Sequence, residues 1–173
     1  MRILKPDKPA NLRRSYRPIA LSSILAKIQE RMILAQLNWY LGNQNLLTVE
    51  QAGFRQNRST MYQLIKLTQE IKWAFNQQES VLAVFVNFSG AYDSIWRAKL
   101  IEKLKSMNIE GNMLAWFSRF FDQTWTKVKY GETFPKYKQT KVGLPQGAVT
   151  STTLSNAYIN DLPNIVRNTK TNI

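Results

Sequence analysis

The sequence lacks two side-chain chemistries altogether, because its 173 residues include no cysteine and no histidine. Without cysteine the chain has no disulfide bond and no thiolate metal site. Without histidine it lacks the commonest general base and the usual zinc ligand. Any catalysis by this chain must therefore rest on carboxylates, amines, hydroxyls or a metal held by oxygen ligands.

Long apolar runs are missing as well. No stretch reaches the roughly 18 residues that a membrane helix needs. The N-terminus, Met1 to Pro6, is basic but has no apolar stretch behind it, which argues against a signal peptide. These absences predict an intracellular protein with no membrane partner. The hydrophobic fraction of 44% is sufficient for the packed core of one domain or a large part of one.

Acidic residues are scarce. The chain has 11 Asp and Glu residues against 24 Lys and Arg residues, a net charge of +13. Such an excess favours a polyanionic partner, most often a nucleic acid, although a basic soluble protein without a specific partner is the alternative. The basic residues gather in two segments, one containing Arg2, Lys5, Lys8, Arg13, Arg14 and Arg17, and the other Lys127, Lys129, Lys136, Lys138 and Lys141.

Caps and apolar spacing predict the elements of the first half. Residues 1–18 are polar and proline-rich and predict an extended arm or hairpin. Ser22 or Ser23 is suited to cap a helix that Gly42 ends, with helical spacing kept by Ile24, Leu25, Ile28, Met32, Ala35 and Trp39. After a loop over 43–59, a second helix is expected from Ser59 or Thr60, with an apolar face of Leu64, Leu67, Ile71 and Phe75.

The second half begins with the clearest strand pattern. Residues 81–88 form a short, continuous β-branched and aromatic run, typical of a central buried strand. Helices are expected over 96–107 and 112–125, a hairpin around Gly131-Glu132, and a loop over 143–147 leading into a helix that runs to about Leu162 and is ended by Pro163. Helical spacing assigns a packing role to the aromatic residues Trp116, Phe117, Phe120, Phe121 and Trp125.

Four blocks give the sequence its specificity. In chain order they are Ser15-Tyr16-Arg17-Pro18-Ile19-Ala20-Leu21, Gln51-Ala52-Gly53-Phe54-Arg55-Gln56-Asn57-Arg58-Ser59-Thr60, Gly143-Leu144-Pro145-Gln146-Gly147-Ala148-Val149 and Asn156-Ala157-Tyr158-Ile159-Asn160-Asp161-Leu162-Pro163, with Ala83–Trp96 between the second and third. Their order and spacing resemble the successive blocks of non-LTR retrotransposon reverse transcriptases, over nearly the whole chain.

The resemblance implies an α+β fold of the right-hand polymerase type. Residues 1–80 would form the fingers, and residues 81–173 an incomplete palm with a ferredoxin-like sheet flanked by helices. It also implies RNA-templated DNA synthesis from a DNA primer, with deoxynucleotides as substrates and Mg²⁺ as the cofactor.

The resemblance also assigns roles to basic residues. Lys5 and Arg17 match the positions that hold the incoming triphosphate, for which an ammonium and a forked guanidinium are suited. Arg55 and Arg58 match arginines that contact the template or the nucleotide. Without the resemblance, all four would be read as solvated arm or loop residues.

The stretch from Asn87 to Asp93 resembles the catalytic strand and turn of the palm. In the family the first position is an aspartate that binds both metal ions, and the next, here Phe88, offers its backbone carbonyl to a metal. Small residues let backbone N–H groups approach the triphosphate, and an aromatic ring excludes the ribose 2′-OH. These roles fall on Gly90, Ala91 and Tyr92, while Gln146 and Gly147 match the loop that lines the nucleotide pocket.

Two departures from the family concern activity. Position 87 is Asn, and an amide oxygen brings no negative charge to a pair of divalent cations. The family's next block carries two adjacent aspartates, but the aspartates of this sequence are Asp7, Asp93, Asp122 and Asp161, none adjacent to another. Smaller departures are Gly90, where the family often has Lys, and Thr152, where it often has Pro.

We therefore expect a palm truncated before the paired aspartates, no polymerase activity, and marginal solubility from an open sheet edge. Three interpretations stay open: a reverse transcriptase domain by descent, a non-catalytic nucleic-acid binder, and a decayed copy with no selected function. A generic basic RNA-binding protein is compatible with the composition but leaves the ordered blocks unexplained.

Overall fold

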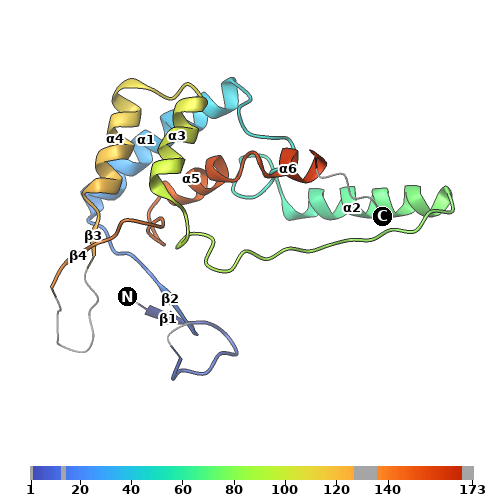
Figure 1. The fold of residues 1–173 in the computed structure, drawn as a ribbon, viewed down its shortest axis with the longest axis horizontal. Coiled ribbons are helices and arrows are strands. Elements are labelled where there is room, and N and C mark those ends of the chain that lie inside the picture. Colours follow the sequence, from blue (N-terminus) through green and yellow to red (C-terminus); the bar gives the residue numbers. More distant parts are fainter. Residues whose placement is uncertain (1, 13–14, 127–135, 169–173) are drawn as a thin grey trace.

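A computed structural model describes residues 2–12, 15–126 and 136–168 of the chain. It shows a mixed fold of six helices and two small antiparallel sheets within these residues (Figure 1). The strands are β1 (Arg2–Leu4), β2 (Tyr16–Pro18), β3 (Trp125–Thr126) and β4 (Lys138–Gln139). The helices are α1 (Ile24–Asn43), α2 (Thr60–Asn76), α3 (Arg97–Ser106), α4 (Gly111–Asp122), α5 (Ser151–Tyr158) and α6 (Leu162–Asn168).

Several sequence-predicted elements are confirmed. β1 pairs with β2 as the expected N-terminal hairpin, with Ile3 opposite Arg17. Ser23 caps α1, because its hydroxyl accepts a hydrogen bond from the Ala26 amide, and Ser59 caps α2 in the same way. β3 and β4 pair as the second hairpin, although its expected turn at Gly131-Glu132 lies outside the described residues.

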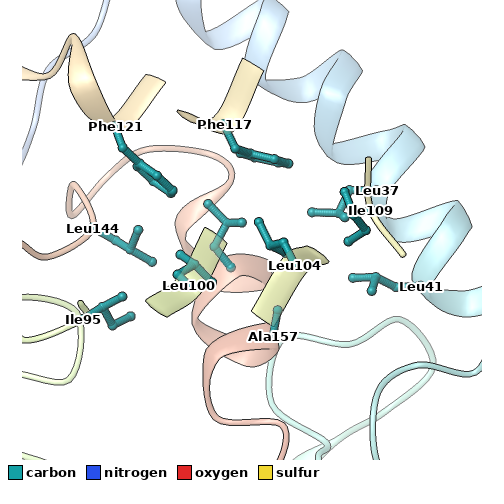
Figure 2. Packing of buried hydrophobic residues seen from close by; sticks show 11 residues of the cluster. Leu37, Leu41, Ile95, Leu100, Leu104, Ile109, Phe117, Phe121, Leu144 and Ala157 are labelled. Carbon is teal, nitrogen blue, oxygen red and sulfur yellow. The ribbon is translucent and has the colours of Figure 1, made fainter. Parts of the chain in front are cut away.

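The core lies where α1, α3, α4 and α5 meet, and α3 packs against both α4 and α5 (Figure 2). Its buried side chains are Leu37, Leu41, Ile95, Leu100, Leu104, Ile109, Phe117, Phe121, Leu144, Leu154 and Ala157. The packing role predicted for the aromatic residues of α4 is confirmed, since Trp116 and Phe120 stack and pack against this cluster. Trp125 differs, because its side chain is exposed.

The sequence misjudged which faces of two helices are buried. The stripe from Ile24 to Trp39 on α1 is largely exposed, whereas Glu30, Leu37 and Leu41 are its buried residues. On α2, only Ala74 is buried, and Leu64 and Phe75 of the expected apolar face are exposed. Both predictions used the spacing of apolar residues alone. That spacing predicts a helix but does not determine which face packs against the rest of the protein.

The predicted end of the last helix was also wrong. The chain forms two helices, α5 and α6, and Pro163 is the second residue of α6 rather than the stop of a longer helix. Proline is tolerated in the first turn of a helix, because the backbone N–H that it lacks has no helical partner there.

The central strand predicted over residues 81–88 was wrong for this structure. These residues have no strand assignment, and their side chains are exposed, Phe85 to 83%. In Figure 1 the segment returns from the far end of α2 as an extended stretch. A central strand forms only where neighbouring strands satisfy its backbone groups, and among the described residues it has no such neighbour.

This exposed segment predicts self-association. It has eight residues without charge, proline or glycine, which is the composition of a strand that pairs with other chains. We expect species larger than a monomer in sedimentation velocity at micromolar concentrations. Val84→Lys should raise the concentration at which they appear by about tenfold or more, because stacked segments would then carry like charges. Gln69→Lys, on the exposed surface of α2, is the matched charge control and should change nothing; a monomeric wild-type chain would refute the prediction.

An ion pair joins α3 to the segment between α5 and α6. The Lys103 ammonium lies 2.5 Å from Asp161 Oδ1 and also donates to the Tyr158 carbonyl. The hydrogen bond from Lys103 lowers the pKa of Asp161 from its ordinary value of 3.8. A depressed folded-state pKa gives stability that is present above pH 3.8 and is lost as the pH falls through the lower folded value.

The pair is half-exposed, so its contribution is screened by water. We expect Asp161→Asn to lower the free energy of unfolding by less than about 1 kcal/mol near neutral pH. Urea titrations of the two proteins should converge at a pH well below 3.8. A difference that persists unchanged in acid would contradict this assignment.

Candidate functional site

The loop over residues 143–147 is anchored on the turn that follows the 81–88 segment. The Gly143 amide donates to the Ile95 carbonyl and the Leu144 amide to the Tyr92 carbonyl, both at 2.8 Å. Gly143 has a φ of +79°, and a Cβ there would lie 2.8 Å from the Asp93 carbonyl oxygen. Conformation and close approach thus both require glycine at this position.

The same loop is joined to the N-terminal arm. The Ala20 amide donates to the Gln146 carbonyl at 2.6 Å. Gly147 has a φ of +106°, and a Cβ on it would lie 2.9 Å from the Ala20 carbonyl oxygen. The glycines at both ends of the loop therefore let it fit between two backbone segments far away in the sequence.

Gln146 is the residue where these segments meet. Its side-chain Nε2 donates to Asp93 Oδ1 at 2.9 Å, while its carbonyl accepts from Ala20. Tyr92, which precedes Asp93 in the chain, is half-buried against the core, and burial raises the pKa of its hydroxyl. Two of the four sequence blocks, the first and the third, are thus brought together with the 83–96 segment that lies between the second and third blocks.

The arm residues Lys5 and Arg17 lie on the β1–β2 hairpin. The Lys5 amide donates to the Ser15 carbonyl at 2.7 Å, directly after the paired strands. Arg17 is exposed and Lys5 is half-buried. Both are on the hairpin that the Ala20–Gln146 hydrogen bond joins to the loop.

Residues 87–91 lead into the same turn. Asn87, Phe88 and Ala91 are exposed. Gly90 has a φ of +65°, and its carbonyl accepts the amides of Asp93 and Ser94 at 2.9 and 3.0 Å. A Cβ at Gly90 would meet only the Asp93 Cβ at 4.0 Å, so its left-handed backbone, rather than lack of space, favours glycine here.

The donors in this region do not fit a two-metal site. Within the described residues, no group of three or more Asp and Glu side chains is placed to hold a metal ion. Position 87 offers a neutral amide, and the nearby Asp93 carboxylate accepts the Gln146 side chain. Two divalent cations need several carboxylates to offset their charge, so these residues alone do not hold the pair.

The two arginines of the second block have local partners. Arg55 donates to the Thr48 carbonyl at 2.7 Å and to the Gln51 carbonyl at 3.3 Å. Burial, and secondarily repulsion from Arg58, lower the pKa of Arg55. Arg58 lies over the Tyr62 ring at 5.8 Å. The structure therefore gives Arg55 a role in shaping its own loop and leaves Arg58 at the start of α2.

Arg97 was missed by the sequence analysis, although it is central to the site's architecture. This first residue of α3 is only 7% exposed. Its Nε donates to the Gly143 carbonyl at 2.7 Å, and its NH1 donates to the carbonyls of Phe121 and Thr140. Burial lowers its pKa, and Asp122 partly opposes that effect. No sequence motif marks this residue, because most of its partners are backbone carbonyls, with the Thr140 hydroxyl as a further acceptor.

Glu30 was also missed. It lies on α1, is 2% exposed, and its Oε2 accepts the Val149 amide at 2.6 Å and the Thr150 amide at 3.4 Å. These amides come just before α5, where the helix dipole favours a negative charge. Glu30 thereby fixes the segment between Gly147 and α5. A lone Glu on the polar side of a predicted helix gives no sign of this role.

In the described part of the chain, no helix is both long and apolar enough to span a membrane.

Three relatives resemble the chain along most of its length. It is 34% identical over 161 residues to "Probable RNA-directed DNA polymerase from transposon BS" of Drosophila melanogaster, covering 93% of this chain and 18% of that protein. It is 27% identical to the corresponding polymerase from transposon X-element of the same species, with the same coverage. To "RNA-directed DNA polymerase from mobile element jockey" of Drosophila funebris it is 28% identical, covering 94% of this chain and 18% of that protein.

The chain thus spans under a fifth of the length of these relatives. Residues 3–173 match the family described as Reverse transcriptase (RNA-dependent DNA polymerase). The family match covers almost the whole chain, and the relatives are polymerases of mobile elements. The chain therefore belongs to the reverse transcriptase family, as a reverse transcriptase domain of the non-LTR retrotransposon type.

Proposed function

We propose that this chain descends from the fingers and palm of an enzyme that copies RNA into DNA, and that it no longer polymerises by itself. Residues 1–80 are assigned to the fingers and residues 81–173 to the palm, with its ferredoxin-like sheet. The observation that carries the proposal is the meeting of the arm, the 90–95 turn and the 143–147 loop at Gln146.

The proposed deoxynucleotide site uses this meeting point. Gln146 and Gly147 line it, and Gly90 and Ala91 let backbone N–H groups approach a triphosphate. Tyr92, whose ring is fixed against the core, is suited to exclude a ribose 2′-OH. Lys5 and Arg17 on the hairpin are suited to bind the phosphates by charge.

This chain by itself is not expected to bind the two metal ions of a polymerase site. Reverse transcriptases use divalent metal, and Mg²⁺ is the proposed ion of the intact family. In a complete site, Asn87 and the Phe88 carbonyl would lie at the metal positions. Position 87 offers a neutral amide, and the described residues contain no cluster of three carboxylates placed to hold a metal ion. We therefore do not expect them to bind two Mg²⁺ ions side by side.

A non-catalytic nucleic-acid binder is the second candidate, favoured by the net charge of +13. Both candidates predict binding to an RNA–DNA template–primer that is independent of sequence. Arg58 is a proposed template contact, and Arg55 acts there through the loop that it shapes. The two candidates differ in whether restoring the carboxylates restores synthesis.

Salt dependence tests the binding that both candidates require. Fluorescence anisotropy with a labelled RNA–DNA template–primer should give a slope of log K against log salt of about −4, if about four or five phosphates are contacted. Lys5→Ala with Arg17→Ala should reduce the steepness by about 2, roughly one for each lost phosphate contact. Lys66→Ala with Lys72→Ala, both exposed on α2, removes the same charge and should leave the slope nearly unchanged. A flat dependence in the wild-type chain would exclude phosphate contacts as the basis of binding.

A further inference from the structure

We propose that Asp93 is a positioning residue that fixes the orientation of the Gln146 side-chain amide. The contact is direct, because Gln146 Nε2 lies 2.9 Å from Asp93 Oδ1. The inference rests on the proposed function only for the identity of the ligand that Gln146 would bind, which is a nucleotide. The orienting contact itself is within this chain.

The chemistry of the two groups decides the orientation. An ionised carboxylate only accepts hydrogen bonds, whereas a glutamine amide has a donor end and an acceptor end of nearly equal shape. Beside Asp93, Gln146 must therefore turn its NH₂ group to the carboxylate and its Oε1 away from it. Without Asp93, rotation of the amide by half a turn would exchange donor and acceptor at little cost. Asp93 thus selects which end Gln146 presents to a ligand.

Both partners are held on anchored backbone. The Asp93 amide donates to the Gly90 carbonyl, and the flanking Tyr92 carbonyl accepts the Leu144 amide. Gln146 is held through its own carbonyl by Ala20. Since the main chain is fixed at both ends of the contact, the side-chain hydrogen bond needs little further ordering when a ligand arrives.

The Asp93–Gln146 contact contributes little to folding, so its effect on Gln146 can be tested without unfolding the chain. Asp93 is exposed and is not a member of the buried hydrophobic cluster. Loss of an exposed hydrogen bond is a minor loss of stability. An Asp93 variant should therefore keep the fold and alter Gln146 alone, which a purely structural residue would not do.

Nuclear magnetic resonance of the Gln146 side-chain amide tests the proposal directly. The full chain, with ¹⁵N-labelled glutamine and Val84→Lys to limit self-association, should show two well-separated Gln146 amide protons and a rigid amide. Asp93→Ala should collapse this separation toward that of a free glutamine. Asp93→Asn keeps an acceptor oxygen and should largely restore it. Glu70→Ala, which removes an exposed carboxylate from α2, is the charge-matched control and should leave the signal unchanged.

A Gln146 signal that is the same in the wild type and in Asp93→Ala would overturn the proposal. So would an effect of equal size in Glu70→Ala. Titration with a deoxynucleoside triphosphate then separates this proposal from the proposed function. Asp93→Ala is expected to weaken binding about fivefold, and Asp93→Asn by less than about twofold. If the amide signal responds as expected but the wild-type chain binds no nucleotide, the positioning role stands and the nucleotide role of Gln146 falls.

Discussion

Primer extension on an RNA template with Mg²⁺ is expected to give no product above background for this chain. The chain offers an amide at position 87 and no pair of adjacent aspartates. Phosphoryl transfer with two metals requires carboxylates that hold both cations and offset their charge. Asp93, the nearest acidic residue in sequence, is engaged by Gln146 and does not replace the missing carboxylates.

A repaired chain is the decisive comparison. It carries Asn87→Asp and continues into the segment that follows the matched region in the transposon BS relative, where the family resemblance places the paired aspartates. We expect it to extend primer, with a rate at least about a thousandfold above the same fusion that keeps Asn87, since loss of metal binding costs several kcal/mol in the transition state. The fusion that keeps Asn87 is the matched control, because it has the same added strands and the same overall length.

The outcomes have different meanings. Extension by the unrepaired chain would refute the proposed inactivity. Extension by the Asn87→Asp fusion alone supports both the fold assignment and the role of position 87. If both fusions are folded and bind template–primer but neither extends it, the chain has lost more than its metal ligands, and the non-catalytic binder becomes the better explanation.

Local features of the fold followed well from sequence, because local chemistry determines them. The first helix was expected to have Ser22 or Ser23 as its cap and the second to start at Ser59 or Thr60, and the hydroxyls of Ser23 and Ser59 each accept a first-turn amide. The sequence also predicted a break between helices over 96–107 and 112–125, and Asn108 and Gly111 within that break both have positive φ. Such signals act within a few residues and do not depend on the rest of the molecule.

Two predictions failed because they depended on a neighbour that is distant in the sequence. The 81–88 run has the composition of a buried strand, but composition does not supply the neighbouring strand that makes it one. The face of α1 was assigned from its apolar stripe, whereas Glu30 on another side is buried by the amides that precede α5. Glu30 is buried because it binds the amide of Val149, which lies 119 positions away. The spacing of apolar residues within one helix does not predict such a distant contact.

The candidate site shows the same division. Gly147 and Gln146 were identified through their block, and the structure gives both a close backbone neighbour. The residues that hold the loop in place were not identified, because Arg97 and Glu30 bind main-chain atoms and belong to no motif. A motif marks the groups that meet a ligand, but the groups that position them are visible only in the folded chain.

Arg97→Met is expected to destabilise the chain by about 3 kcal/mol or more, the largest effect of any single substitution proposed for its stability. Methionine keeps much of the buried stem but removes every hydrogen-bond donor. The carbonyls of Gly143, Phe121 and Thr140 would then lose a charged partner. The Phe121 carbonyl keeps the Thr124 amide at 3.4 Å, but a buried acceptor left unpaired costs about 1–3 kcal/mol. Urea unfolding followed by tryptophan fluorescence measures the change, and Arg119→Met, exposed on α4, should stay within about 0.5 kcal/mol of wild type.

Arg97→Lys distinguishes the geometry of the group from its charge. Lysine keeps a cation, but its single ammonium lacks the planar fork that reaches the ends of α4 and β4 and the 143–147 loop together, so it should restore less than half of the lost stability. Faster hydrogen exchange at the Gly143 and Leu144 amides in Arg97→Met would locate the damage in that loop. Equal stability of Arg97→Met and Arg119→Met would show that these contacts do not hold the fold, and the loop would then depend for its position on the backbone hydrogen bonds to Ile95, Tyr92 and Ala20.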